Sequence, residues 1–163
     1  MSLNAPIGMT RARTLAVLLA CGALLVACDR FRAQPQGLLR DQDPQVVAQG
    51  RAIYQARCAT CHGAQLEGQP NWRERDASGR LLAPPHNASG HTWHHPDDVL
   101  FKITKYGVAK TINQKDYNSA MPAFEGTLSD AEIVAVLSWI KSQWPPKYRK
   151  AQEEVNRAAL ENR

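Results

Sequence analysis

The sequence predicts an all-α domain of three to four helices joined by long loops. Three segments place apolar side chains three and four residues apart, the spacing of one helix face, and each begins with a helix-start signal. The stretches between them carry a proline pair and turn residues that oppose a helix. The chain has 163 residues, 44% apolar and 21% charged, which fits one folded domain and argues against a disordered chain or a polytopic membrane protein.

Residues 1–27 have the pattern of a secretory signal of the lipoprotein type. Basic residues precede an apolar run over residues 15–27, which is too short to span a hydrocarbon core of ~30 Å. The run ends in Leu25-Val26-Ala27-Cys28, which resembles the lipobox of bacterial lipoproteins and implies that Cys28 becomes the acylated first residue. The following Asp29 resembles an inner-membrane retention signal. The alternatives are an uncleaved anchor or cleavage at another position.

Three further ranges complete the predicted organisation. Residues 28–42 are polar, contain Pro and Gly, and are predicted to be a flexible tether between lipid and domain. The folded domain covers residues 43–146. Residues 147–163 mix both signs of charge and predict a polar, weakly helical C-terminal tail.

Each helix of the domain has its own start signal. The first opens at Asp43-Pro44, an acidic N-cap followed by proline, and Gly50 inside it lets another element approach closely. The second opens at residues 96–98 with acids in its first turn and ends at Gly107. The third opens with a capping box at residues 129–132 and continues as an amphipathic pattern.

Two long loops separate these helices. Residues 63–95 show no sustained periodicity, although Asp76-Ala77-Ser78-Gly79 predicts a turn within them. Residues 108–128 form the second predicted loop. A structureless stretch of this length in a compact domain is usually functional, so we expect residues 63–95 to wrap a bound group.

The chemistry of the chain is concentrated in Cys58-Ala59-Thr60-Cys61-His62. This is the C-x-x-C-H signature of covalent c-type haem attachment. On a helical turn the two thiols and the imidazole lie on one side, so both sulfurs can reach the vinyl groups of one porphyrin above His62. A thioredoxin-like site would need a βαβ pattern, and a zinc site would need more ligands at matched spacing; neither is visible.

Met121 is the candidate for the second axial ligand of the iron. The other two methionines, Met1 and Met9, lie in the signal, and Met121-Pro122 lies in a polar loop that proline stiffens. A thioether ligand favours the ferrous state and raises the potential. The alternative is that Met121 is ordinary core filling.

These motifs resemble the monohaem class I cytochromes c of bacteria over about residues 44–143. The matching features are a first helix with Gly50 and Tyr54 leading into CATCHG, a Met-Pro loop and a last helix from Ser129. The resemblance implies an all-α cytochrome c fold wrapped around one covalent haem. It also implies that the first and last helices cross, with Gly50 and Tyr54 meeting partners from the set Leu137, Trp139 and Ile140.

Three further residues are candidates for binding the haem, and the resemblance implies the first of them. The family has a proline whose carbonyl accepts the N–H of the proximal imidazole, and Pro70 is the candidate. Trp93 is a candidate hydrogen-bond donor to a haem propionate. Tyr117, in the loop that carries Met121, is a third candidate cofactor-binding residue.

Four histidines lie outside the haem motif and close together: His86, His91, His94 and His95. We favour a structural role for them, as polar loop residues near the haem or as a helix cap. The alternatives are a second metal site, for example copper, and replacement of Met121 by one of them as axial ligand.

Four lysines recur between the second helix and the methionine loop: Lys102, Lys105, Lys110 and Lys115. They could steer an acidic redox partner to the haem edge, but an ordinary solvated face is the favoured interpretation. The net charge of +5 is mild and no long block of like charges occurs, so nucleic acid is not an expected partner.

Together these features predict a one-electron carrier with a single haem c and His/Met ligation. We expect it to be held by lipid on the periplasmic side, at the inner rather than the outer membrane, and to exchange electrons with redox proteins. We expect an electron-transfer protein rather than an enzyme, and no nucleophile–base pair or paired carboxylates suggest a hydrolase. The alternatives are a peroxidase, a cytochrome subunit of a respiratory oxidase or reductase, and a protein that handles haem or copper through the histidine-rich loop.

Overall fold

The computed structural model describes residues 37–162. The predicted signal, Cys28 and the first part of the predicted tether lie outside these residues. Within residues 37–162, no helix has both the length and the apolar character that crossing a bilayer requires.

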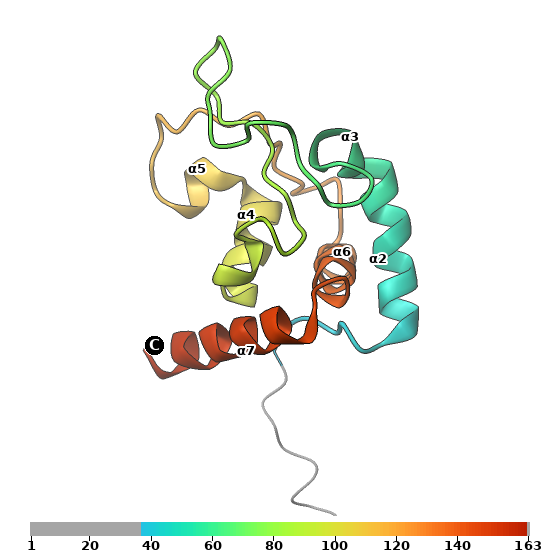
Figure 1. Ribbon diagram of the computed structural model, residues 1–163. Helices are drawn as coiled ribbons and strands as arrows, with labels where there is room; N and C mark the ends of the chain where they lie inside the picture. The colour runs from blue at the N-terminus through green and yellow to red at the C-terminus, as the bar shows by residue number, and fades with distance from the viewer. Residues whose placement is uncertain (1–36, 163) are drawn as a thin grey trace, which may run out of the picture. The chain divides into compact units, whose positions relative to one another are not determined.

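The described part of the chain is helical, as the sequence predicts (Figure 1). It contains no strand, only isolated bridges from Leu81 to Arg75 and to Ser119. The helices, in chain order, are α2 (Pro44–Arg57), α3 (Ala59–His62), the 3-10 helix η1 (Thr92–His94), α4 (Asp97–Tyr106), α5 (Val108–Thr111), α6 (Asp130–Ser142) and α7 (Pro146–Glu161).

Side-chain caps confirm the start signals of the first and third predicted helices. The Asp43 carboxylate accepts from the backbone N–H groups of Gln45 and Val46 at the start of α2. At the start of α6, Ser129 and Glu132 form both hydrogen bonds of a capping box. Gly107 ends α4 at a φ of 83°, which favours glycine.

The core is built where α2 packs against α6. Helix α6 is the most buried element, and its Ile133 and Val136 side chains are almost fully covered. The rings of Tyr54 on α2 and Trp139 on α6 lie 4.5 Å apart between centroids. Gly50 faces the carbonyl of Ala135 and the Cβ of Trp139 so closely that a side chain would not fit. The predicted helix crossing is therefore present, with Trp139 as a partner.

One predicted loop contains a helical turn that the sequence did not indicate. Helix α5 occupies Val108–Thr111, inside the range predicted as loop. It starts directly after Gly107, and the Thr111 hydroxyl donates to the carbonyl of that glycine. A single turn is too short to show a helical period, which explains why the pattern missed it.

The last part of the predicted tether is also not a tether. Leu39 is only 6% exposed, and its backbone N–H donates to the Asp97 carboxylate. The N–H of Arg40 donates to the Ser138 hydroxyl on α6. These polar partners lie far away in sequence, so the composition of residues 37–42 could not reveal that the segment packs on the domain.

The C-terminal tail is a regular helix that belongs to the domain. Helix α7 runs without a break over Pro146–Glu161, and its Gln152 side chain is fully buried. The Gln152 amide donates to the Asp97 carboxylate and to the carbonyl of His95. A buried polar contact leaves no hydrophobic signature, so the sequence predicted a looser tail.

We expect Gly50→Ala to destabilise the protein. Helix propensity alone would favour alanine by about 1 kcal/mol. The added Cβ would instead collide with the Ala135 carbonyl, and we expect a net loss of about 2 kcal/mol, typical of an overpacked core. Denaturant unfolding of the haem-loaded protein measures the difference.

The control is Ala52→Gly, which removes a Cβ at an exposed position of the same helix. It should cost about 1 kcal/mol through propensity alone. A Gly50→Ala variant that is more stable than the parent protein would show that α2 and α6 do not approach closely at this position.

Candidate functional site

The C-x-x-C-H motif lies at the junction of α2 and α3. Cys58 closes α2 and precedes α3, and the backbone N–H groups of Cys61 and His62 both donate to its carbonyl. Cys58 is half-buried against the core, Cys61 is exposed and His62 is 7% exposed. Neither cysteine is in a disulfide, so both thiols are available on the turn that carries the imidazole.

The orientation of the His62 ring is fixed by a backbone carbonyl. Its Nδ1 lies 2.9 Å from the carbonyl oxygen of Pro84. A carbonyl can only accept, so Nδ1 carries the proton and the lone pair of Nε2 is free. Burial lowers the pKa of His62, and the Pro84 hydrogen bond only partly opposes this. The ring is therefore a neutral imidazole with one nitrogen ready to bind a metal.

The prediction that Pro70 supplies this carbonyl is wrong, because Pro84 does so. Pro70 is exposed, whereas the chain returns fourteen residues later and places Pro84 beside the motif. The Pro84-Pro85 pair in the sequence predicts only that no helix forms there. Nothing in the sequence pattern gives its distance from His62.

Two short segments pair to bring Pro84 into place. The N–H of Gln69 donates to the carbonyl of Ala83, and the N–H groups of His86 and Asn87 donate to that of Leu66. Gly68 permits this approach, because a Cβ there would press on the backbone of Pro84-Pro85. Its φ of 70° also favours glycine. Gly68 and Pro84 are thus site residues that the sequence analysis did not single out.

Tyr54 joins the core to the end of the motif. Its hydroxyl donates to the carbonyl of Gly63 at 2.8 Å. The side chain is fully buried, and burial is the main reason why its pKa lies well above the ordinary value, with Cys58 and Glu67 adding to the effect. Tyr54 was predicted as a packing residue; the structure shows that its hydroxyl also holds the chain where it leaves α3.

Met121 lies in a loop that is attached to α4. The N–H groups of Phe124 and Glu125 donate to carbonyls at the end of α4, and the N–H of Met121 donates to the Ser119 hydroxyl at 3.1 Å. The Met121 side chain is half-buried and packs on the same core as Cys58. The loop thus holds a thioether at the core that also supports the C-x-x-C-H turn.

Trp93 has a buried polar atom without a partner. Its indole Nε1 is enclosed and has no hydrogen bond within the described part of the chain. The ring packs on His94, with centroids 3.7 Å apart, and on Tyr148 of α7 at 4.8 Å. Because a buried N–H without an acceptor is costly, this atom indicates an acceptor outside residues 37–162.

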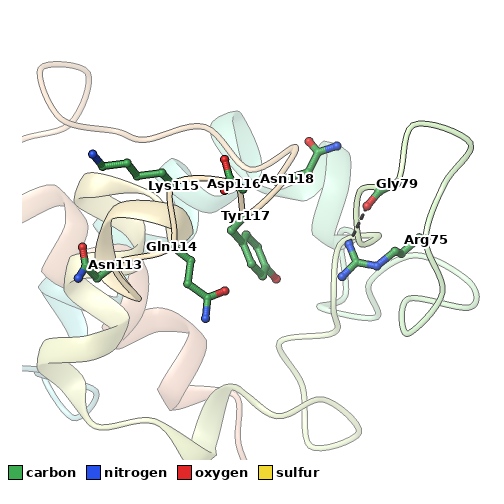
Figure 2. A pocket seen from close by; sticks show the side chains of 8 residues that line it. All are labelled: Arg75, Gly79, Asn113, Gln114, Lys115, Asp116, Tyr117 and Asn118. Carbon is green, nitrogen blue, oxygen red and sulfur yellow. Dashed lines mark hydrogen bonds between the residues drawn. The ribbon is translucent and has the colours of Figure 1, made fainter.

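Tyr117 lies in a different cavity from the C-x-x-C-H residues. The cavity, of about 630 Å³, is lined by residues 113–118 and by Arg75 and Gly79 across from them. Figure 2 shows the Tyr117 ring pointing into this space, while the Arg75 guanidinium donates to the Gly79 carbonyl at 2.6 Å. The walls are polar loops, so the structure gives Tyr117 no contact with the motif.

The loop histidines do not assemble into a metal site. Within residues 37–162, no group of three or more His, Cys, Asp or Glu side chains is arranged to hold a metal ion. His91 stacks on Trp72 at 5.4 Å and contacts His95 edge-on at 5.5 Å. Burial is the first cause that lowers the pKa of His91 and of His95. These contacts support the structural interpretation.

His86 lies on the same side of the site as His62. The two rings stack at 4.0 Å, and His86 Nδ1 lies 2.8 Å from the Thr92 hydroxyl. The carbonyl of His86 accepts from the indole of Trp144 at 2.7 Å. A ring stacked on His62 would lie on the same side of a porphyrin as His62, so this geometry opposes the alternative that His86 replaces Met121.

The lysines between α4 and the methionine loop are mostly paired with carboxylates of the same chain. Lys102 pairs with Asp98 at 3.2 Å, and Lys105 pairs with Asp130 at 2.7 Å. Lys110 lies 3.8 Å from Glu125, and Lys115 lines the cavity of Figure 2. This pairing favours the interpretation as a solvated face.

An all-helical domain with a C-x-x-C-H turn, a neutral buried imidazole and a loop thioether defines the c-type cytochrome class. Residues 45–140 match the protein family described as cytochrome C oxidase, cbb3-type, subunit III, and the chain belongs to this family. No curated protein and no solved structure matches the chain.

Family membership confirms the predicted class. The protein is a monohaem class I cytochrome c that carries a covalent haem c with iron. Its role is haem-based electron transfer with redox partner proteins, and cbb3-type cytochrome c domains are exported to the periplasmic side.

We expect the stabilising contribution of Tyr54 to be lost in alkali. An unfolded tyrosine ionises near pH 10, whereas buried Tyr54 holds its proton to higher pH. Its contribution is therefore complete below about pH 10 and falls as the pH rises above that value. Tyr54→Phe, which leaves the Gly63 carbonyl without its donor, should cost about 1 kcal/mol at pH 7.

Unfolding free energies of both proteins between about pH 7 and pH 11 give the measurement. Because all other titrating groups are common to the two proteins, their difference isolates Tyr54. It should shrink above about pH 10, and a gap that stays constant over this range would contradict the buried, un-ionised phenol.

Proposed function

We propose that this chain is a one-electron carrier in which Cys58 and Cys61 hold the haem and His62 and Met121 are the axial ligands. The observation that carries the proposal is the hydrogen bond from His62 Nδ1 to the Pro84 carbonyl. It presents Nε2 as the ligating atom and raises the basicity of the ring, as partners of metal-bound histidines do.

The residues fit a c-type haem. Two thiols on one helical turn suit two thioether bonds, and the neutral imidazole of the same turn suits the iron. The indole N–H of Trp93 has no acceptor within residues 37–162, and a haem propionate would suit it as acceptor. The haem supplies the Fe(II)/Fe(III) couple. Tyr117 remains a predicted haem-binding residue.

The protein has three tasks around this group. His62 is held in one orientation by Pro84, so its position need not change when the charge of the metal centre changes. The core of α2 and α6 excludes water beside the motif, which favours the less charged state. The loop anchored to α4 holds Met121, and a thioether raises the potential.

We further propose that Cys28 is acylated and that the domain is tethered on the periplasmic side, at the inner membrane. The support is the lipobox-like Leu25-Val26-Ala27-Cys28 and the Asp29 that follows it. A second candidate function is that of a cytochrome subunit of a respiratory oxidase, which the description of the matched family favours. The copper-handling alternative loses support, because the loop histidines do not converge.

We expect Met121→Leu to remove the sixth ligand while keeping the volume of the side chain. The ferric protein should lose the charge-transfer band of a thioether-bound iron, and the potential should fall by a sizeable part of the ~0.8 V that axial ligands span. Optical spectra and potentiometric titration measure both quantities.

Met121→Leu should also bind carbon monoxide rapidly in the ferrous state, because the iron then has an open position. Ala120→Gly, at the exposed preceding residue, is the control and should leave the spectrum unchanged. Retention of the band in Met121→Leu would show that another residue is the ligand.

We expect Cys28→Ser to release the protein from the membrane. The substitution removes the atom to which acyl chains attach, and stable anchoring requires more than one chain. Metabolic labelling with a radioactive fatty acid and detergent partitioning of the periplasmic and membrane fractions test this. Labelling that persists in Cys28→Ser would place the lipid elsewhere, and equal partitioning of both proteins would refute the anchor.

A further inference from the structure

We propose that residues 37–41, here called the strap, turn the α7 face of the domain toward the lipid surface. The inference rests on the proposed acylation of Cys28. A docked strap fixes the point at which the anchored chain leaves the domain. The C-x-x-C-H end then faces away from the bilayer, toward a water-soluble redox partner.

The strap is held by directed hydrogen bonds as well as by burial. Leu39 is 6% exposed, and its N–H donates to Asp97 Oδ2 at 3.1 Å. The next N–H, from Arg40, donates to Ser138 Oγ at 2.8 Å. Leu38, which precedes Leu39, is 45% exposed. The strap therefore has one inward and one outward leucine.

Asp97 makes the strap part of a buried polar network. This carboxylate is 4% exposed at the first position of α4, where the helix N-terminus favours negative charge. Gln152 donates to its other oxygen, and Asn156 accepts the Asp97 backbone N–H at 2.8 Å. If the strap left, a buried carboxylate would lose one of its donors, which is costly.

Asp41, the last residue of the strap, forms ion pairs with side chains of α6 and α7. Asp41 lies 3.7 Å from both Lys141 Nζ and an Arg149 guanidinium nitrogen. The Lys141 side chain is 4% exposed, and its other carboxylate is Glu153 at 3.8 Å. Removing Asp41 would therefore leave a buried lysine with a single acidic neighbour, which opposes undocking.

The strap leaves the domain at the α7 end. Gly37 lies against the side chains of Asp97 and Asn156, at the start of α4 and on α7. Figure 1 shows α7 at one end of the domain and α3, with the turn at residues 76–79, at the other. The attachment point and the haem motif are thus on opposite ends.

Docking of the strap shortens the length of chain between the proposed lipid anchor and the domain. Eight residues lie between Cys28 and Gly37, so these two residues are at most about 30 Å apart whatever the conformation of the segment. Without docking the first fixed residue would be Asp43, the N-cap of α2, and the span would reach about 50 Å. The docked strap thus keeps the α7 face closest to the bilayer and shortens the reach of the opposite end.

Limited trypsin digestion of the full-length haem-loaded protein tests the docking. The bond after Arg40 should be cut at least about tenfold faster in Leu39→Asp, which places a charge beside Asp97, than in the parent protein. Leu38→Asp is the matched control and should be cut at the parent rate. Equal rates in the parent and Leu39→Asp would overturn the docking.

If Leu39→Asp does not retain a native haem spectrum, Ser138→Ala is the second variant. It removes the acceptor of the Arg40 N–H, together with the hydroxyl's hydrogen bond to the Val134 carbonyl on its own helix, and should also accelerate cleavage after Arg40. An unchanged rate in Ser138→Ala, with Leu39→Asp unfolded, counts against the docking as well.

Photo-crosslinking in proteoliposomes tests the orientation. A photoreactive phenylalanine analogue replaces either Lys150 on α7 or Ala77 in the turn at the other end; both positions are exposed. Lipid adducts should be several-fold more frequent from position 150 in the parent, and Leu39→Asp should reduce this ratio. Equal labelling from both positions in the parent would overturn the proposal.

The two assays separate this inference from the anchor on which it rests. Cys28→Ser should abolish lipid adducts at both positions without changing protection of the bond after Arg40. Absence of adducts in the parent would refute the anchor and the orientation together, while protection after Arg40 would still show that the strap is docked.

Discussion

The site depends on one hydrogen bond, from His62 Nδ1 to the carbonyl of Pro84. A C-x-x-C-H turn fixes the backbone position of the histidine. It does not fix which ring nitrogen carries the proton or how the side chain is rotated. The proline carbonyl settles both, because it can only accept and because its ring-restrained backbone holds it still. The fold of the loop over residues 63–95 places this oxygen atom beside the buried His62 ring.

Delivering that oxygen constrains much of the surrounding chain. Gly68 has to lack a side chain so that Pro84-Pro85 can approach. The Leu66 carbonyl has to accept the backbone N–H groups of His86 and Asn87, which follow the proline pair. The carbonyl of His86 then accepts the indole N–H of Trp144, which lies between α6 and α7. This hydrogen bond ties the position of the loop over residues 63–95 to the helices that form the core.

The sequence predicted local features well and long-range polar contacts poorly. Asp43, Gly107 and the capping box of α6 work through neighbours within a few residues, so their pattern is complete in the sequence. Which proline carbonyl reaches His62 depends on how a long loop folds back, and no local pattern around Pro70 or Pro84 gives that distance. The crossing at Gly50 was predictable because a family resemblance supplied the long-range information that periodicity lacks.

The same reasoning explains why the predicted domain, residues 43–146, is too short at both ends. Hydrophobic patterns find helices that bury apolar faces, whereas α7 is held by the buried amide of Gln152, and the strap by its backbone N–H groups. These contacts meet at Asp97, whose buried carboxylate accepts from Leu39 near one end of the domain and from Gln152 near the other. A buried acid at a helix start thus requires that the segments before α2 and after α6 fold together with the core, and the domain extends from Gly37 to the end of α7.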